Sequence, residues 1–137
     1  MTTQSGSNEA LVDVRGVSRS FQGAGSIVHA VREVSMQVRV GEFLALCGRS
    51  GSGKTTLLNL IAGLDRPDRG SVHLAGEEIS HASEGRLTEL RRHTVGFVFQ
   101  SFALLPLFSA RENVELACWI KNFERRPFGC YRTVISS

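Results

Sequence analysis

A run of glycine, serine, lysine and threonine near the middle of the chain has the composition and spacing of a phosphate-binding loop. Residues 48–55 read Gly-Arg-Ser-Gly-Ser-Gly-Lys-Thr, which fits glycine, four residues of any type, and then Gly-Lys-Ser/Thr. Glycines allow the backbone to adopt positive φ and to approach an anion closely. Successive backbone N–H groups in such a turn point inward and bind phosphate oxygens. The run therefore predicts a site for a polyphosphate.

The functional groups in this run have separate expected roles. The Lys54 ammonium would reach the β- and γ-phosphates of a nucleotide, and the Thr55 hydroxyl would be a ligand of magnesium. A helix that begins near Lys54 would aim its positive end at the same phosphates. Arg49 is expected to contribute its backbone only. The residues expected to bind the nucleotide here are Gly48, Ser50, Gly51, Ser52, Gly53, Lys54, Thr55 and Thr56.

The segments on either side of the loop have the order that such a site requires. Residues 43–47 form a continuous apolar run, which predicts a strand of a parallel sheet covered on both faces, with Cys47 as a small buried side chain. Leucine and isoleucine at helical spacing follow over residues 55–62, and Gly63 is expected to end that helix. A chance match to the motif would lack this strand, loop and helix context.

The rest of the chain predicts an α/β fold. Alternating or short apolar patterns indicate strands over residues 10–17, 27–31, 34–40, 71–75 and 95–99. Helices are expected over residues 86–92 and 109–122, and Ser109 with Glu112 has the spacing of a capping box. The predicted fold is thus a mostly antiparallel β part at the N-terminus, followed by the loop, a helix and part of a parallel core.

Composition narrows the class of protein. The 137 residues suit one small domain, and a net charge of +3 without a dense Lys/Arg patch argues against a nucleic-acid partner. The polar first nine residues do not resemble a secretory signal, and no apolar run approaches the roughly 20 residues that a membrane helix needs, so a cytosolic chain is expected. Three widely spaced cysteines predict neither a disulfide framework nor a zinc site.

Two stretches of the sequence resemble the ATP-binding subunit of ABC transporters. One is GEFLALCGRSGSGKTTLLNLIAGLDRPDRG, which ends at Gly70, and the other is VGFVFQSFALLPLFSARENVE, residues 95–115. The motif Leu-Leu-Pro followed by Arg-Glu-Asn-Val is most similar to sequences of the branch that serves lipoprotein release and macrolide export. The resemblance covers about residues 10–120.

The resemblance implies an incomplete P-loop NTPase fold of ABC type, with ATP and Mg²⁺ as cofactors. Residues 10–120 would be a partial ATP-binding domain, residues 1–9 a disordered N-terminus and residues 121–137 an atypical tail. By resemblance, Gln100 contacts magnesium and the attacking water and begins a loop that touches the membrane subunits. Phe21 by the same resemblance stacks on adenine. Taken alone, Phe21 would also suit a core aromatic residue, and Gln100 an exposed strand end.

The resemblance also implies partners and a location. Such a subunit couples ATP binding and hydrolysis to transport or extrusion, works with a transmembrane permease subunit, and forms a homodimer of ATP-binding subunits. It is cytoplasmic and lies peripherally at the inner face of the cell membrane. The transported substrate is chosen by the membrane subunits and is not readable from this chain.

The sequence after Gln100 departs from the family pattern. Residues 101–137 contain no Ser-Gly-Gly-Gln signature, no apolar strand ending in Asp-Glu and no switch histidine. Since phosphoryl transfer depends on positioning and charge stabilisation, we expect this chain to bind nucleotide with hydrolysis near background. The missing strand would leave an open sheet edge, so we do not expect a stable monomer. A frameshift or early stop would explain the tail, a hypothesis that the adjoining DNA would test.

Two alternatives stay open at this point. A different P-loop protein, such as a small kinase or a GTPase, would need its own reading motif, and the guanine-reading Asn-Lys-x-Asp does not occur. An inactive fragment or partner-binding module would share every feature of an ATPase as far as Ile120.

Overall fold

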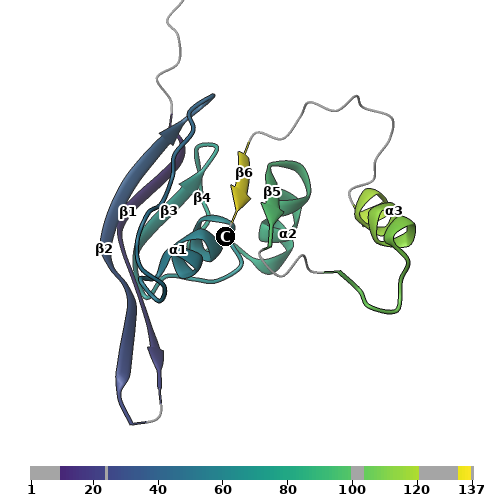
Figure 1. The fold of residues 1–137 in the computed structure, drawn as a ribbon. Coiled ribbons are helices and arrows are strands. Elements are labelled where there is room, and N and C mark those ends of the chain that lie inside the picture. The colour runs from purple at the N-terminus through teal and green to yellow at the C-terminus, as the bar shows by residue number, and fades with distance from the viewer. Residues whose placement is uncertain (1–9, 24, 100–103, 121–132, 137) are drawn as a thin grey trace, which may run out of the picture. The chain divides into compact units, whose positions relative to one another are not determined.

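The computed structural model of the chain describes residues 10–23, 25–99, 104–120 and 133–136 (Figure 1). The expectations for the first nine residues and for Gln100 lie outside these ranges. The described residues belong to two compact units, Met1–His81 and Ala82–Ser137, and each is described by itself.

The first unit is built on a four-stranded antiparallel sheet. Its strands lie in the order β2-β1-β3-β4, where β1 is Ala10–Gln22, β2 is Ile27–Arg39, β3 is Arg69–Leu74 and β4 is Glu77–Glu78. Buried side chains of β1, among them Val12, Val14 and Val17, give the sheet an apolar side that a helix can cover. The predicted antiparallel part at the N-terminus is therefore confirmed, and it also includes β3 and β4.

One long strand replaces the two that were predicted before the loop. β2 runs through the expected break without interruption, although Glu33 has a positive φ of 48°. The Glu33 N–H donates a hydrogen bond of 2.9 Å to the Ser18 hydroxyl of β1. A local backbone irregularity that is held by the neighbouring strand bends the ribbon without ending it.

Helix α1, Lys54–Ile61, contacts β1, β2 and β3 and makes the core of the first unit with them (Figure 1). The helix ends at Ile61 with Ala62 as its C-cap, and the next residue, Gly63, has a positive φ of 64°, which suits a glycine after a helix. Burial of each large apolar side chain contributes roughly 1.5–3 kcal/mol. The most buried apolar side chains in this unit are Val12, Val14, Val17, Leu60, Val72 and Leu74.

The segment before the loop is not a strand, which corrects the expectation for residues 43–47. No regular structure is assigned there, Phe43 is 92% exposed, and Cys47 is exposed instead of buried. A strand needs hydrogen-bonded neighbours, and within the described ranges no strand pairs with this segment. Leu46 of this run is half-buried, and the other apolar residues of the run are exposed.

The second unit contains two helices and a two-stranded parallel sheet. Helix α2 is Glu84–His93, β5 is Val95–Val98, α3 is Ala110–Ile120 and β6 is Thr133–Ser136. β5 pairs in parallel with β6, from Val95 opposite Thr133 to Val98 opposite Ser136. The sequence analysis did not predict β6, because the tail has no clear hydrophobic periodicity. Among the helices of the described part of the chain, none is long and apolar enough to cross a membrane.

The predicted capping box at the start of α3 is present. The Glu112 carboxylate accepts hydrogen bonds from the Ser109 N–H at 2.8 Å and from its hydroxyl at 2.7 Å. The Glu112 N–H in turn donates to the Ser109 hydroxyl at 3.3 Å. These bonds satisfy donors that a helix N-terminus leaves free, and they lower the pKa of Glu112.

Candidate functional site

The loop of residues 48–53 turns sharply and leads directly into α1. Gly51 and Gly53 have positive φ angles of 78° and 86°, and the Ser52 N–H donates a bond of 3.2 Å to the Arg49 carbonyl. The helix begins at Lys54, so its first backbone N–H groups and its positive end lie at the loop. The start of the helix is where the sequence pattern placed it.

One glycine of the loop, Gly53, stands where a larger residue would not fit, and a second, Gly48, lies close to a neighbouring side chain. A Cβ at Gly53 would overlap the carbonyl oxygen of Ala30 in β2, so the loop packs directly on the backbone of the sheet. A Cβ at Gly48 would lie 2.7 Å from the Ser52 hydroxyl oxygen. Glycine is required at position 53 for two reasons, its positive φ and the close approach of the Ala30 backbone, whereas the Ser52 hydroxyl near Gly48 can rotate away.

The Lys54 side chain folds back over the loop. Its ammonium donates to the carbonyl oxygens of Gly48 at 2.8 Å and of Arg49 at 2.9 Å, and lies 3.2 Å from the Ser52 hydroxyl. A positive charge is thus held in the concave side of the turn, next to the positive end of α1. The arrangement suits the binding of an anion such as a phosphate group.

The other residues that were expected to contact a nucleotide or a metal are less constrained. Thr55 is exposed in the first turn of α1, and Thr56 is half-buried beside it. Within the described residues, no group of three or more His, Cys, Asp or Glu side chains is arranged to hold a metal ion. A hydroxyl in the first helical turn fits a magnesium ion whose remaining ligands come from a nucleotide and water.

Phe21 lies near the end of β1, opposite Val28 of β2. Phe21 is 41% exposed, so the structure does not bury it as a core aromatic residue. The Arg19 guanidinium lies over the ring, 4.8 Å from its centroid. Val28 is only two residues from Ala30, on whose carbonyl Gly53 packs. A short segment of β2 therefore borders both the phosphate loop and the residue expected to bind adenine.

Arg19 is held by two carboxylates, a cluster that the sequence analysis missed. Its guanidinium pairs with both oxygens of Asp65 at 2.9 Å and with Asp68 at 2.8 Å. The Ser20 N–H also donates to Asp68 at 2.7 Å. The bond from Arg19, aided by that amide, lowers the pKa of Asp68, and the bond to Asp68 raises the pKa of Arg19. One signal in the sequence could have predicted the contact between Arg19 and Phe21: residues two apart on a strand lie on the same face.

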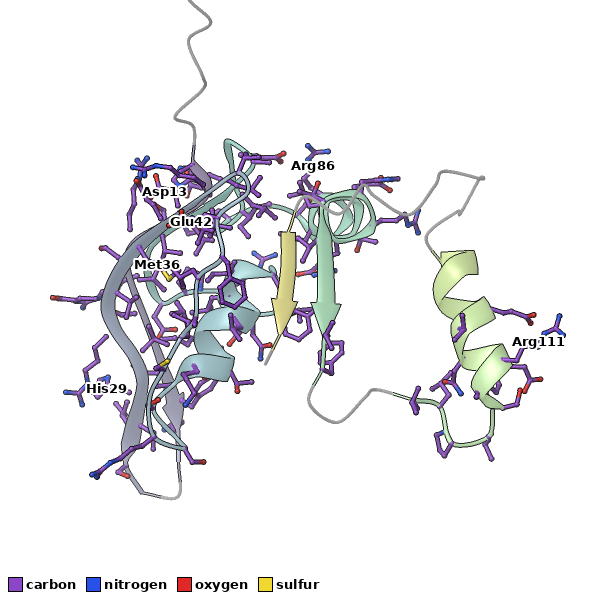
Figure 2. All side chains as sticks on the ribbon, turned by 45° about the horizontal axis from the view of Figure 1, so that its top comes forward. Asp13, His29, Met36, Glu42, Arg86 and Arg111 are labelled. Carbon is purple, nitrogen blue, oxygen red and sulfur yellow. The ribbon has the colours of Figure 1, made fainter. Side chains whose placement is uncertain are left out.

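A polar hollow of about 620 Å³ lies elsewhere on the first unit. Its lining includes Ser20, His29 and Arg69, and it contains no residue of the loop. Figure 2 shows His29 on β2 pointing away from α1. The phosphate loop is therefore the better candidate, because it combines glycine geometry, a helix N-terminus and a fixed cation.

The sequence matches the family described as "ABC transporter" over residues 31–133. This match covers more than half of the chain. The chain belongs to the ABC transporter family. The chain is 44% identical over 107 residues to the pyoverdine export ATP-binding/permease protein PvdT of Pseudomonas syringae pv. syringae, covering 77% of the chain and 16% of that protein. It is 43% identical over 106 residues to the macrolide export ATP-binding/permease protein MacB of Wolinella succinogenes, with the same coverage of each chain.

Solved structures of this family confirm the fold. The ATP-binding cassette MJ0796 of Methanocaldococcus jannaschii, solved as a dimer bound to ADP and Pi, is 37% identical, with a TM-score of 0.78. The match covers 85% of this chain and 50% of that one. This ABC-family chain therefore has an incomplete P-loop NTPase fold of ABC type. It spans about half of the solved cassette and a sixth of the ATP-binding/permease relatives.

Proposed function

We propose that this chain is part of the ATP-binding component of an ABC transporter, which couples ATP binding and hydrolysis to export. The observation that carries the proposal is the loop in which the Lys54 ammonium is held by carbonyl oxygens at the N-terminus of α1. A fixed cation beside oriented amides binds the phosphates of a nucleotide. Relatives named for pyoverdine and macrolide export support the direction of transport.

The residues of the loop would bind the phosphates, and Lys54 would exchange its carbonyl partners for β- and γ-phosphate oxygens. Thr55 and Gln100 would ligate Mg²⁺, with Gln100 also at the attacking water. Phe21, which is 41% exposed, would stack on adenine. Residues 10–120 would form the nucleotide-binding domain, and residues 121–137 would lie outside it.

The proposed partners are a second ATP-binding subunit and a transmembrane permease at the inner face of the cell membrane. Solved relatives described as dimeric support the first partner. The second is supported by the relatives PvdT and MacB, whose names join an ATP-binding part to a permease. The domain would then lie in the cytoplasm, at the periphery of the membrane.

The test of nucleotide binding is thermal unfolding of the chain with and without Mg-ATP. A ligand at a hundredfold excess over its Kd stabilises the folded state by about 2.7 kcal/mol, so the unfolding temperature should rise by several degrees. Lys54→Ala should abolish the rise, whereas the matched loop variant Arg49→Ala should keep it. A wild-type chain that shows no shift at millimolar Mg-ATP would refute the proposal.

Competition between ATP and GTP for the site distinguishes an ABC-type ATPase from other classes of P-loop protein. ATP should compete for the site at least as well as GTP, because a stacked aromatic ring reads a base without a guanine-specific partner. A strong preference for GTP would favour a GTPase instead. Phosphate release above that of Lys54→Ala would show that the chain hydrolyses ATP as well as binding it.

A further inference from the structure

The Arg19 guanidinium is fixed from two sides on the face of β1 that carries Phe21. One side lies over the Phe21 ring, 4.8 Å from the centroid, and the other reaches the carboxylates of Asp65 and Asp68 at 2.8–2.9 Å. The Arg19 side chain is 25% exposed, so these contacts are partly screened from water. A planar guanidinium can stack on an aromatic ring while its N–H groups bind carboxylates in the plane of the guanidinium itself.

The carboxylates connect this arginine to the phosphate-binding helix. The Asp65 N–H donates to the Asn59 carbonyl of α1 at 3.3 Å, so Asp65 continues directly from the end of that helix. Asp68 is tied to β1 in both directions, since its N–H donates to the Ser18 carbonyl at 2.9 Å and its carboxylate accepts from the Ser20 N–H at 2.7 Å. A continuous set of bonds therefore runs from the Phe21 ring through Arg19 to the end of α1.

The charge of Arg19 is already neutralised by its partners. Two carboxylates surround one guanidinium, so the cluster carries no surplus positive charge that would attract a phosphate. Lys54 differs, because its ammonium faces only neutral oxygens of the loop. Arg19 is consequently suited to hold an aromatic ring and unsuited to bind a triphosphate.

We propose that Arg19 is a positioning residue for the nucleotide base. It holds one face of the Phe21 ring and fixes that ring relative to α1, so that the exposed part of the ring meets adenine when the phosphates occupy the loop. The inference rests on the proposed function, because it assigns the base-binding end of the same site. Without Arg19 the ring would keep its place in the sequence but would lose its fixed orientation.

The experiment compares two ligands, Mg-ATP and Mg-tripolyphosphate, which share the phosphates and differ in the base and sugar. Titration calorimetry on the full chain would measure both affinities for the wild type, Arg19→Ala, Arg19→Lys and Arg15→Ala. Arg15 is the matched control, since it also pairs with a carboxylate from β1, Asp13 at 2.6 Å, without contacting the ring. Arg19→Ala should weaken ATP binding by about threefold to tenfold and leave tripolyphosphate binding unchanged.

Arg19→Lys should restore part of the loss, because a lysine keeps the charge over the ring but not the planar fork. Arg15→Ala should change neither affinity.

Equal binding of ATP by Arg19→Ala and wild type would overturn the inference, and so would a parallel loss of affinity for both ligands. If circular dichroism shows Arg19→Ala to be unfolded, Asp68→Asn replaces it, with a smaller selective loss of ATP expected and no selective loss counting against the inference. A wild type that binds neither ligand refutes the proposed function itself.

Discussion

At the scale of single residues, conformational requirements and charge decide the site. Gly53 is needed both for its φ of 86° and because a side chain would meet the Ala30 carbonyl, whereas Gly51 has a similar φ of 78° with open space around it. The two glycines therefore separate the effect of backbone strain from the effect of crowding. Lys54 adds a charge that the local turn holds in place.

Gly53→Ala should destabilise the chain more than Gly51→Ala. A positive φ costs an alanine roughly 1–2 kcal/mol, which applies at both positions, but crowding against the Ala30 carbonyl adds to the cost at position 53. The measurement is the free energy of unfolding in urea for both variants, with a difference of at least about 1 kcal/mol expected. Equal destabilisation would mean that the loop does not pack on β2 as described.

Acid should weaken the Arg19 cluster. Because the folded-state pKa of Asp68 is lowered, its stabilisation is fully present above the ordinary aspartate value and is lost as pH falls through the folded pKa. Asp68→Asn should thus be less stable than wild type at about pH 7, and the gap should shrink below about pH 4. Urea unfolding at several pH values measures the gap. A gap that stays constant down to about pH 2 would contradict the assignment.

At the scale of elements, local caps and paired backbone neighbours decide where helices begin and where strands form. α3 begins with the Ser109 and Glu112 capping box, and α2 begins with Ser83, whose hydroxyl accepts from the Arg86 N–H. β5 has a neighbour in β6, whereas residues 43–47 have none among the described strands. The same kind of apolar run therefore forms a strand in one place and not in the other.

Ser109→Ala should destabilise α3 by about 1 kcal/mol, because it removes a capping hydroxyl. Arg111→Ala is the control, since its ion pair with Glu115 at 2.6 Å is exposed and such pairs contribute only a few tenths of a kcal/mol. Amide hydrogen exchange along α3 would measure both changes. Comparable exchange rates in the two variants would contradict the role of the cap.

Removing the residues after 132 should loosen β5. Its backbone would lose the hydrogen-bonded neighbour that pairs with residues Val95 to Val98, so its amides should exchange with solvent at least about tenfold faster. Exchange monitored by mass spectrometry on wild type and the shortened chain provides the comparison, with β1 as an internal reference. Unchanged protection of β5 would mean that β6 is not its partner in solution.

At the scale of the whole molecule, the described core is unevenly divided. The first unit buries apolar side chains from β1, β2, β3 and α1, while the buried apolar side chains described in the second unit are Leu87, Leu90 and Val95. Stability grows with the apolar surface removed from water. Among the described side chains, less apolar surface is thus buried in the second unit, and from these we predict that it is the less stable of the two.

Unfolding should not follow a single transition. Trp119, the only tryptophan of the chain, lies in the second unit and reports on it by fluorescence, whereas far-UV circular dichroism also reports the long strands of the first. In urea the fluorescence midpoint should precede that of circular dichroism. Coincident midpoints would show that the two units unfold as one.

The sequence by itself determined the features that depend on neighbours along the chain. Glycine, lysine and threonine spacing predicted the loop and the helix start at Lys54, and Ser109 with Glu112 predicted a cap, because each of these needs only a few consecutive residues. Alternation of apolar and polar residues predicted the first part of β1, residues 10–17, and a short apolar pattern predicted β3. The family resemblance supplied the fold class that the comparisons confirm.

Tertiary structure decided the features that depend on contacts between distant segments. The pairing of Arg19 with Asp65 and Asp68 spans more than forty residues, and the joining of β5 to β6 required a partner that had no pattern of its own. The run at residues 43–47 shows the reverse case, since apolar residues form a strand only where another strand offers its backbone N–H and C=O groups.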